Sequence, residues 1–269
     1  MLNFAFKSFR MSGFLFNDVI FGPVRSRRLG LSLGINLLPV HAKYCSFNCI
    51  YCECGWTSPN LAEHPEFPSR DEVAAFLEQR LLELGSEDYM PDAITFAGNG
   101  EPTLHPEFAG IVDDTLNLRN LLAPGAQVTV LSNSSMISIP AIFDALQKLD
   151  QNILKLDAGS ETIFNLINNP VQPVQFSELV GNLKKFHGNL VIQSMFLRGN
   201  FKGHAVDNTT PSETEAWIGH LVEIKPKLVM MYPVARATPL HNLEKIGTEE
   251  LERIAEKVRQ AGLIVQVYQ

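Results

Sequence analysis

Three cysteines, Cys45, Cys49 and Cys52, lie on one short stretch, separated by three and then by two residues. Thiolates at this spacing converge on one small object from one side. Cysteine thiolates are the usual ligands of iron–sulfur clusters, and a cube with four irons takes four ligands. Three cysteines would leave one iron open to bind another molecule. The spacing therefore favours a [4Fe–4S] cluster with one open corner.

Zinc is the alternative occupant of this stretch. Cys54 follows Cys52 closely and His41 precedes Cys45, so a closed site with four ligands could be assembled. Zinc sites more often use two separated pairs of ligands, and no second pair is present here. Structural disulfides are less favoured, because they belong to oxidising compartments and four clustered cysteines brace little of a long chain.

The CxxxCxxC loop, with the aromatic Tyr51 before its last cysteine, resembles the signature of the radical S-adenosylmethionine (radical SAM) superfamily. The resemblance implies that SAM chelates the open iron through its amino and carboxylate groups. The reduced cluster would cleave SAM to a 5′-deoxyadenosyl radical, which takes a hydrogen atom from a substrate. It also implies an electron donor such as flavodoxin or ferredoxin, and backbone contact between Tyr51 and the adenine.

A glycine-rich stretch, Gly98-Asn99-Gly100-Glu101, follows an expected strand and resembles the "GGE" stretch of the same family. In the family this strand end binds the amino group of SAM. Glycine lets a backbone approach a ligand closely. A tight turn between strand and helix would need the same glycines, and the two interpretations are compatible.

Further polar residues follow or interrupt other expected strands. Ser132, Asn133 and Ser134 could bind the ribose or carboxylate of SAM or the substrate, or cap a helix. Gln193 lies within a strand, and a buried amide must find partners. The SAM ribose and a structural partner are equally compatible with it.

Two arginines follow strands near the end of the chain. Arg198 and Arg236 could bind the SAM carboxylate or an acidic substrate, or simply carry surface charge.

Lys155 and Asp157 are the candidate catalytic residues. They alternate with leucines in an expected strand, so both lie on one face. If that face lines the barrel interior, the two charges must pair with each other or take part in chemistry. An internal salt bridge is the structural alternative.

Two stretches resemble one branch of the superfamily, the Fe–S oxidoreductases related to wyosine-base synthases. They are "FGPV-SRRLG-SLGIN" near the start, and "KLDAGSE" followed by "INNP". The first contains Arg25, Arg27 and Arg28, which could hold a phosphate or carboxylate or serve as surface charges. The synthases carry a second cluster, and only Cys54 is left over for one. A formal net charge of −7 also fails to support tight tRNA binding. The substrate could be a small molecule, a peptide or a nucleoside.

Short apolar strands alternate with helices along the chain, which indicates a parallel sheet with outer helices. We expect an α/β fold, a partial (β/α)6 TIM-like barrel, as residues 21–269 after an extension at 1–20. The cysteines would follow the first strand, at the catalytic face of such a barrel. Ser212 is the expected cap of one helix. The expected strands are 33–39, 92–97, 127–131, 152–157, 190–196, 228–232 and 262–267; the expected helices are 68–85, 106–122, 140–149, 161–167, 176–186, 211–224 and 248–260.

The composition is that of an ordinary globular protein, with 45% hydrophobic and 19% charged residues. No apolar run reaches the ~18 residues of a membrane span. We therefore expect a cytoplasmic enzyme without membrane contact. The alternatives are wyosine-type tRNA base modification, and a non-catalytic barrel stabilised by zinc or by an iron–sulfur cluster.

Overall fold

The computed structural model describes residues 13–57, 65–235 and 238–269. Its centre is one sheet with the strand order β1-β2-β3-β4-β5-β6-β8-β10, in which β7 and β9 pair with β6. All neighbours from β2 to β10 on this path run parallel, and β1 is antiparallel to β2. The strands are β1 (Ile20–Ser26), β2 (Gly30–Ile35), β3 (Ala93–Phe96), β4 (Gln127–Ser132), β5 (Gln151–Lys155), β6 (Val191–Phe201), β7 (His204–Asp207), β8 (Leu228–Pro233), β9 (Glu244–Lys245) and β10 (Val265–Val267).

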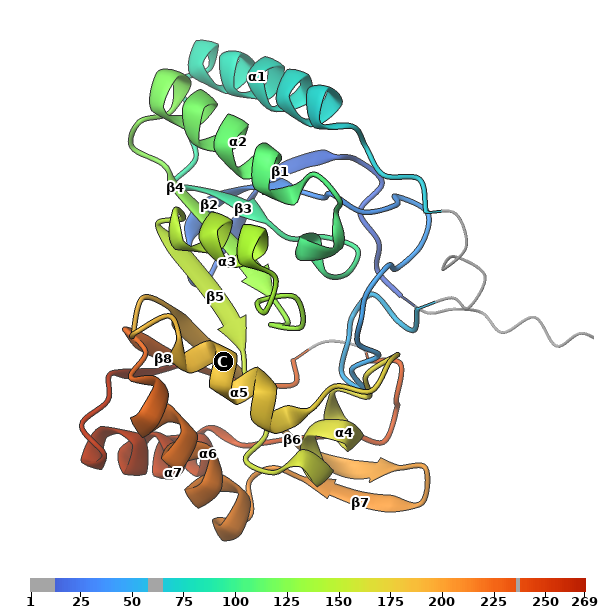
Figure 1. The fold of residues 1–269 in the computed structure, drawn as a ribbon, viewed down its shortest axis with the longest axis vertical. Helices are drawn as coiled ribbons and strands as arrows, with labels where there is room; N and C mark the ends of the chain where they lie inside the picture. The colour runs from blue at the N-terminus through green and yellow to red at the C-terminus, as the bar shows by residue number, and fades with distance from the viewer. Residues whose placement is uncertain (1–12, 58–64, 236–237) are drawn as a thin grey trace, which may run out of the picture.

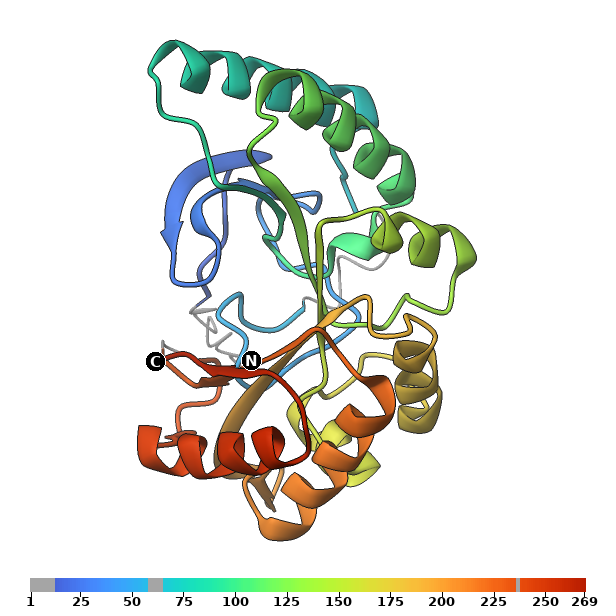
Figure 2. The same ribbon diagram turned by 90° about the vertical axis from the view of Figure 1, so that its left-hand side faces the viewer.

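Helices cover the outer face of this sheet (Figure 1). Figure 2 shows α1 and α2 at one end of the molecule and α6 and α7 at the other. The two edge strands, β1 and β10, do not pair within the described ranges, so the barrel is partial and open along one side. The helices are α1 (Arg70–Ser86), η2 (Pro102–Leu104, a 3-10 turn), α2 (Phe108–Leu122), α3 (Pro140–Gln147), α4 (Glu161–Ile167), α5 (Phe176–Lys184), α6 (Pro211–Ile224) and α7 (Thr248–Gln260).

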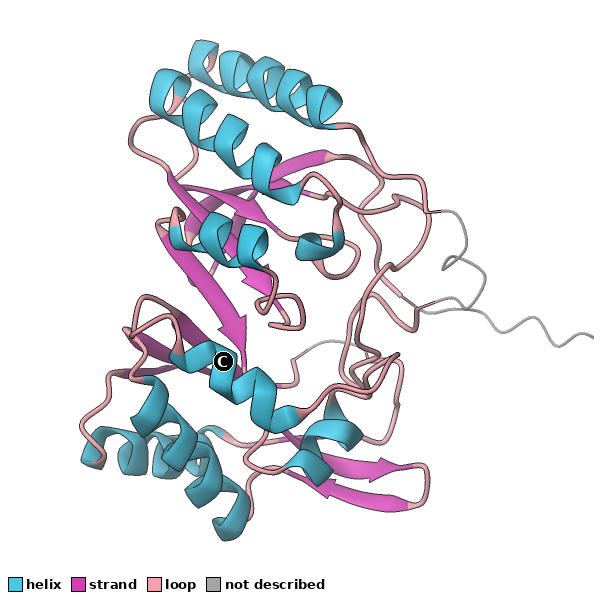
Figure 3. Ribbon diagram, viewed as in Figure 1, coloured by secondary structure: helices cyan, strands magenta, loops and turns pink. Residues whose placement is uncertain are grey.

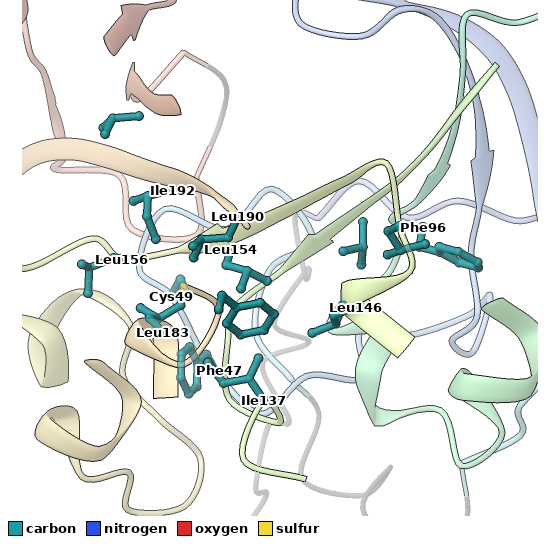
Figure 4. Close-up of a cluster of buried hydrophobic side chains, with 14 of the residues drawn as sticks. Phe47, Cys49, Phe96, Ile137, Leu146, Leu154, Leu156, Leu183, Leu190 and Ile192 are labelled. Atoms are coloured by element: carbon teal, nitrogen blue, oxygen red, sulfur yellow. The ribbon is translucent and has the colours of Figure 1, made fainter. Parts of the chain in front are cut away.

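The main core lies between the strands and the outer helices. Alternate strand residues such as Ile94, Leu154 and Ile192 are fully buried there, and Figure 4 shows part of this cluster. The inward-facing residues form a smaller cluster that includes Leu29, Ile153 and Met230. The expected α/β fold with a partial parallel barrel is therefore confirmed.

Capping side chains mark the starts of α1, α4 and α6. Ser69 caps α1 with a reciprocal bond to Glu72, a complete capping box. The expectation for α6 was wrong by two residues, because the side chain of Thr210, not of Ser212, accepts the N–H of Glu213. Pro211 occupies the first helical position, so the cap must precede it.

Loops gather at the carboxyl ends of the parallel strands, on the right-hand side of the view in Figure 3. In Figure 1 the chain preceding α1 runs through this region, between the turn after β3 and helix α4. That chain contains the cysteines. No helix of the described ranges is both long and apolar enough to cross a bilayer.

Candidate functional site

The cysteine loop is held on one side by the backbone that follows β3. Tyr44 N–H donates to the carbonyl of Asn99 at 2.8 Å, and Glu101 N–H donates to the carbonyl of Tyr44 at 3.2 Å. Tyr44 and Gly100 thus pair as a short parallel bridge. The loop extends the parallel sheet beyond the end of β3.

The opposite side of the loop is held by the backbone that follows α4. Ile50 N–H donates to the carbonyl of Ile167 at 2.9 Å, and Val171 N–H donates to the carbonyl of Ser46, also at 2.9 Å. Phe47 pairs with Pro170 between these bonds. The turn after β3 and the end of α4 with the segment that follows it therefore fix the cysteine loop through main-chain atoms.

Glycine is required where the loop meets the turn after β3. A Cβ at Gly100 would lie 1.8 Å from the carbonyl oxygen of Tyr44, and its φ of +146° disfavours any side chain. A Cβ at Gly98 would lie 2.4 Å from Asn36 Oδ1. The glycines of this stretch thus allow the tight turn between strand and helix that the sequence predicted for them.

Side-chain amides contact two of the three sulfurs. Asn133 Nδ2 donates to Cys45 Sγ and Asn168 Nδ2 donates to Cys49 Sγ, each at 3.5 Å. Cys49 is buried, and Figure 4 shows it beside Leu154, Leu156 and Leu183. Hydrogen bonds to sulfur are a feature that tunes iron–sulfur clusters.

The donor set suits an iron–sulfur cube. All four cysteines are free thiols, and three of them lie on the clamped loop at the predicted spacing. Across the described ranges, no three His, Cys, Asp or Glu side chains gather tightly enough to share a single metal ion. A cube spreads its thiolates over different irons, so the type and number of donors are the relevant test.

Burial and neighbouring charges act on these thiols in opposite directions. Burial raises the pKa of Cys45 to about 12, against the opposing effect of Lys43. A hydrogen bond from Cys54 lowers the pKa of Cys52 to about 5, and the same contact raises the pKa of Cys54. Because metal binding deprotonates thiols, loading a cluster here would release protons.

Tyr51 joins the two candidate catalytic residues. Its hydroxyl donates to Asp157 and accepts from Lys155 Nζ, 3.1 Å away. The Lys155 ammonium also lies 4.8 Å from the centre of the Tyr51 ring. Asp157 is buried and accepts two more N–H groups, from Asn168 and the backbone of Met195, both at 2.8 Å. Lys155 and Asp157 are therefore linked through the tyrosine hydroxyl.

Glu101 is a buried carboxylate that organises the neighbouring strand end. It accepts the hydroxyl of Thr103 at 2.6 Å and the backbone N–H of Asn133 at 2.5 Å. Burial raises the pKa of Glu101, although these hydrogen bonds oppose the shift. By holding Asn133, Glu101 also orients the amide that contacts Cys45.

Other predicted residues differ in how far their side chains are engaged by the protein itself. The Asn99 side chain is used internally, since it bonds the backbone of Phe16 and of Pro39. The Ser132 hydroxyl accepts the N–H of Ser134 at 3.1 Å. Gln193 is buried beside Lys155 in the strand register, and its amide makes no hydrogen bond to described residues.

The two predicted arginines differ in how far the structure describes them. Arg198 contacts Glu250 at 2.5 Å and also pairs with Asp207 and Glu244. Its guanidinium is therefore already supplied with carboxylates. Arg236 lies outside the described residues.

The arginine-rich turn between β1 and β2 lies across the open side of the barrel. The guanidinium of Arg28 is 4.9 Å from the centre of the Tyr232 ring in β8, and Tyr232 stacks on Tyr268 at 4.8 Å. Leu29 packs into the same interior cluster. This turn thus connects the two edges that the sheet leaves unpaired.

Two residues of the site were not predicted from the sequence. Asn168 lies in the "INNP" stretch that carried the resemblance, yet nothing in that stretch indicates a contact with Cys49. Lys43 is 1% exposed and donates to the carbonyl of Gly55 at 3.0 Å. Burial lowers the pKa of Lys43, but the four surrounding cysteines outweigh burial and raise it. Lysine side chains are mostly exposed, so only the structure shows that Lys43 is buried.

Comparison with known proteins defines the class of this fold and site. The radical SAM superfamily model matches residues 40–206, which include the cysteine loop and the strands through the middle of the sheet. The chain belongs to the radical SAM superfamily. Members of this superfamily use a [4Fe–4S] cluster and SAM, and they depend on a reductant and a substrate.

Among sequence relatives, a protein named GTPase Obg from Brachyspira hyodysenteriae is 30% identical over 252 residues, covering 92% of this chain and 34% of that protein. A UPF0026 protein from Methanocaldococcus jannaschii is 33% identical over 183 residues, covering 66% of this chain and 54% of the relative. The chain thus spans between a third and somewhat more than half of these relatives.

Solved structures share the fold at low identity. A radical SAM methyltransferase from Sphaerobacter thermophilus matches with a TM-score of 0.64 at 15% identity, covering 88% of this chain and 65% of that one. TYW1 with a lysine–pyruvate adduct bound matches with a TM-score of 0.57 at 15% identity, covering 85% of this chain and 73% of that one.

Proposed function

We propose that Cys45, Cys49 and Cys52 hold a [4Fe–4S] cluster with one open iron, and that the chain uses it to cleave SAM and abstract hydrogen from a substrate. When bound and reduced, such a cluster supplies one electron to the SAM sulfonium. The observation that carries the proposal is the clamped loop, which presents three free thiols at the carboxyl ends of the strands. The family membership of the chain supports it.

The chain's own residues would bind and orient SAM around that loop. The backbone of residues 98–101 is our candidate for the SAM amino group, because the Asn99 side chain is committed to Phe16 and Pro39. We assign Ser132, Asn133 and Gln193 to the ribose and carboxylate, and the Tyr51 backbone to the adenine. An Arg198 contact with the carboxylate would require it to exchange one of its present carboxylate partners.

Lys155 and Asp157 remain the proposed catalytic pair. Asp157 accepts hydrogen bonds from Tyr51, Asn168 and Met195, so it fixes the Tyr51 hydroxyl. Within the described ranges Lys155 donates one hydrogen bond, to that hydroxyl, and an ammonium has three N–H donors. We therefore propose that Lys155 contacts the substrate and that Asp157 positions Lys155 through Tyr51.

The sequence motifs place the chain, in our proposal, in the branch related to wyosine-base synthases, without their second cluster. We propose that residues 21–269 form one domain after a short extension, in the cytoplasm, served by flavodoxin or ferredoxin as donor. The substrate would be a small molecule, a peptide or a nucleoside. A net charge of −7 favours these over an intact tRNA.

The decisive experiment is anaerobic reconstitution followed by dithionite reduction and assay for 5′-deoxyadenosine. We expect the product with the wild type and with Cys54→Ala. The single variants Cys45→Ala, Cys49→Ala and Cys52→Ala should lose both cluster and product. A protein with a full cluster that forms no 5′-deoxyadenosine would overturn the proposal. One tightly held zinc without iron or sulfide would favour the zinc-stabilised alternative.

A second function has one observation in its favour. Cys54 lies within hydrogen-bonding reach of Cys52 and also contacts the carbonyl of Gly98 at 3.5 Å. A fourth thiolate from Cys54 would close the open iron and leave a cluster suited to electron transfer or sensing. In that case adding SAM would not change the EPR signal of the reduced cluster.

A further inference from the structure

Lys43 is a buried cation beneath the cysteine loop. It is among the largest side chains that are fully buried, at 1% exposed. It enters the loop just before Cys45, and its Nζ reaches the carbonyl of Gly55 on the far side of the loop, at 3.0 Å. Gly55 N–H in turn donates to the carbonyl of Cys52 at 3.0 Å. The lysine side chain therefore spans the loop from its entry to its exit.

Within the described structure, no carboxylate forms an ion pair with the Lys43 ammonium. Among the residues that the structure describes, Lys43 donates one hydrogen bond, to a neutral carbonyl, whereas an ammonium has three donors. Its Nζ bonds Gly55 from a position two residues before Cys45, so the side chain bridges the two ends of the segment that carries all four cysteines. A buried ammonium without an anionic partner is costly, so its placement implies an anion at the loop.

Two buried carboxylates near the loop already accept hydrogen bonds from other groups. Glu101 accepts hydrogen bonds from Thr103 and Asn133, and Asp157 accepts from Tyr51 and Asn168. Both carboxylates therefore have partners other than Lys43. Lys43 is paired with neither of them.

A cube held by three thiolates is an anion, and it gains another negative charge on reduction. A fixed positive charge close by stabilises the reduced state more than the oxidised state, and net charge is one determinant of cluster potential. We propose that Lys43 is the counter-charge of the cluster and raises its reduction potential. This inference rests on the proposed function and concerns the same site. Lys43 would act through the cluster as a positioning and tuning residue.

The test is an EPR-monitored redox titration of the reconstituted protein without SAM, comparing Lys43→Met and Lys43→Gln with Lys43→Arg. We expect the neutral variants to lower the ratio of reduced to oxidised cluster at a fixed potential by tenfold or more. A tenfold change corresponds to about 59 mV for a one-electron couple. Lys43→Arg should stay near the wild type because it keeps the charge. Lys257→Met, which removes an exposed lysine on α7, is the charge-matched control and should leave the potential unchanged.

Each outcome decides the proposal. A neutral variant that loads a full cluster with the wild-type potential overturns it. If the neutral variants lose the cluster while Lys43→Arg keeps it, the positive charge is required to hold the cluster, which supports its role as the counter-charge. If Lys43→Arg behaves like the neutral variants, the lysine acts by its fit under the loop and the proposal fails. A wild type that binds no cluster refutes the proposed function itself, which is a separate result.

Discussion

Gly100 offers the sharpest test of how the cysteine loop is held. Replacing it by alanine places a Cβ 1.8 Å from the Tyr44 carbonyl oxygen, so the loop must move away from the turn after β3. The movement breaks the two backbone hydrogen bonds between Tyr44 and residues 99 and 101. We therefore expect Gly100→Ala to loosen the loop and to reduce iron loading.

The magnitude follows from two contributions. Two backbone hydrogen bonds are worth about 1 kcal/mol each, and a non-glycine residue at this dihedral costs about 1–3 kcal/mol. The sum is about 3–5 kcal/mol, a large share of the ~5–15 kcal/mol that stabilises a typical domain. With a urea slope of about 3 kcal/mol per M, the midpoint should fall by about 1 M or more.

The assay combines urea unfolding of the cluster-free protein with iron and sulfide analysis after anaerobic reconstitution. Gly125→Ala is the matched control, because an added Cβ there meets nothing within 4 Å and the backbone is not left-handed. It should change stability by less than about 0.5 kcal/mol. If Gly100→Ala unfolds at the same urea concentration as this control and loads the same iron, the close contact at Gly100 does not hold the loop.

Two further predictions concern buried polar groups. Tyr51→Phe removes the hydroxyl that Asp157 accepts, so urea unfolding should show a loss of about 1–3 kcal/mol. Iron content should be unchanged. Tyr89→Phe, at an exposed tyrosine, is the control and should have no effect on stability. Equal stability of the two variants would contradict a stabilising hydrogen bond between Tyr51 and Asp157. Burial lowers the pKa of His105, whose Nε2 lies 2.8 Å from the Pro68 carbonyl while Nδ1 accepts a backbone N–H. Because the unfolded chain then binds the extra proton more readily, stability should fall as pH drops below about 6.5, the usual histidine value. Comparing urea midpoints at pH 7.5 and 5.5, His105→Gln should lose less stability than the wild type; an identical loss would refute this account.

Apolar spacing and the placement of glycine and proline predicted the helices and most parallel strands well, but the strand expected at 33–39 is Gly30–Ile35. The helix at 161–167 and the helix at 248–260 begin and end where expected, because apolar spacing marks them and Ser160 caps the first. The hairpins were not predicted. β1 and β7 carry mixed polar and apolar residues and lie at edges, so they lack the apolar run that identifies a buried strand.

The cysteine loop could be predicted from the sequence, whereas its surroundings could not. Spacing alone marks Cys45, Cys49 and Cys52 as a group. The contacts of Asn168 with Cys49, and of Lys43 across the loop, join residues whose proximity depends on tertiary packing. The link between Lys155 and Asp157 through Tyr51 is likewise invisible to a pattern that shows only that both share a face.

The cysteine loop owes its position to main-chain pairing with Asn99, Glu101, Ile167 and Val171. Amino acid exchanges at most loop positions leave such pairing intact, since every residue type except proline offers the same N–H and C=O groups. Evolution is therefore free to vary the side chains around the sulfurs, and with them the affinity for ligands and the redox behaviour, while the sulfurs stay in place.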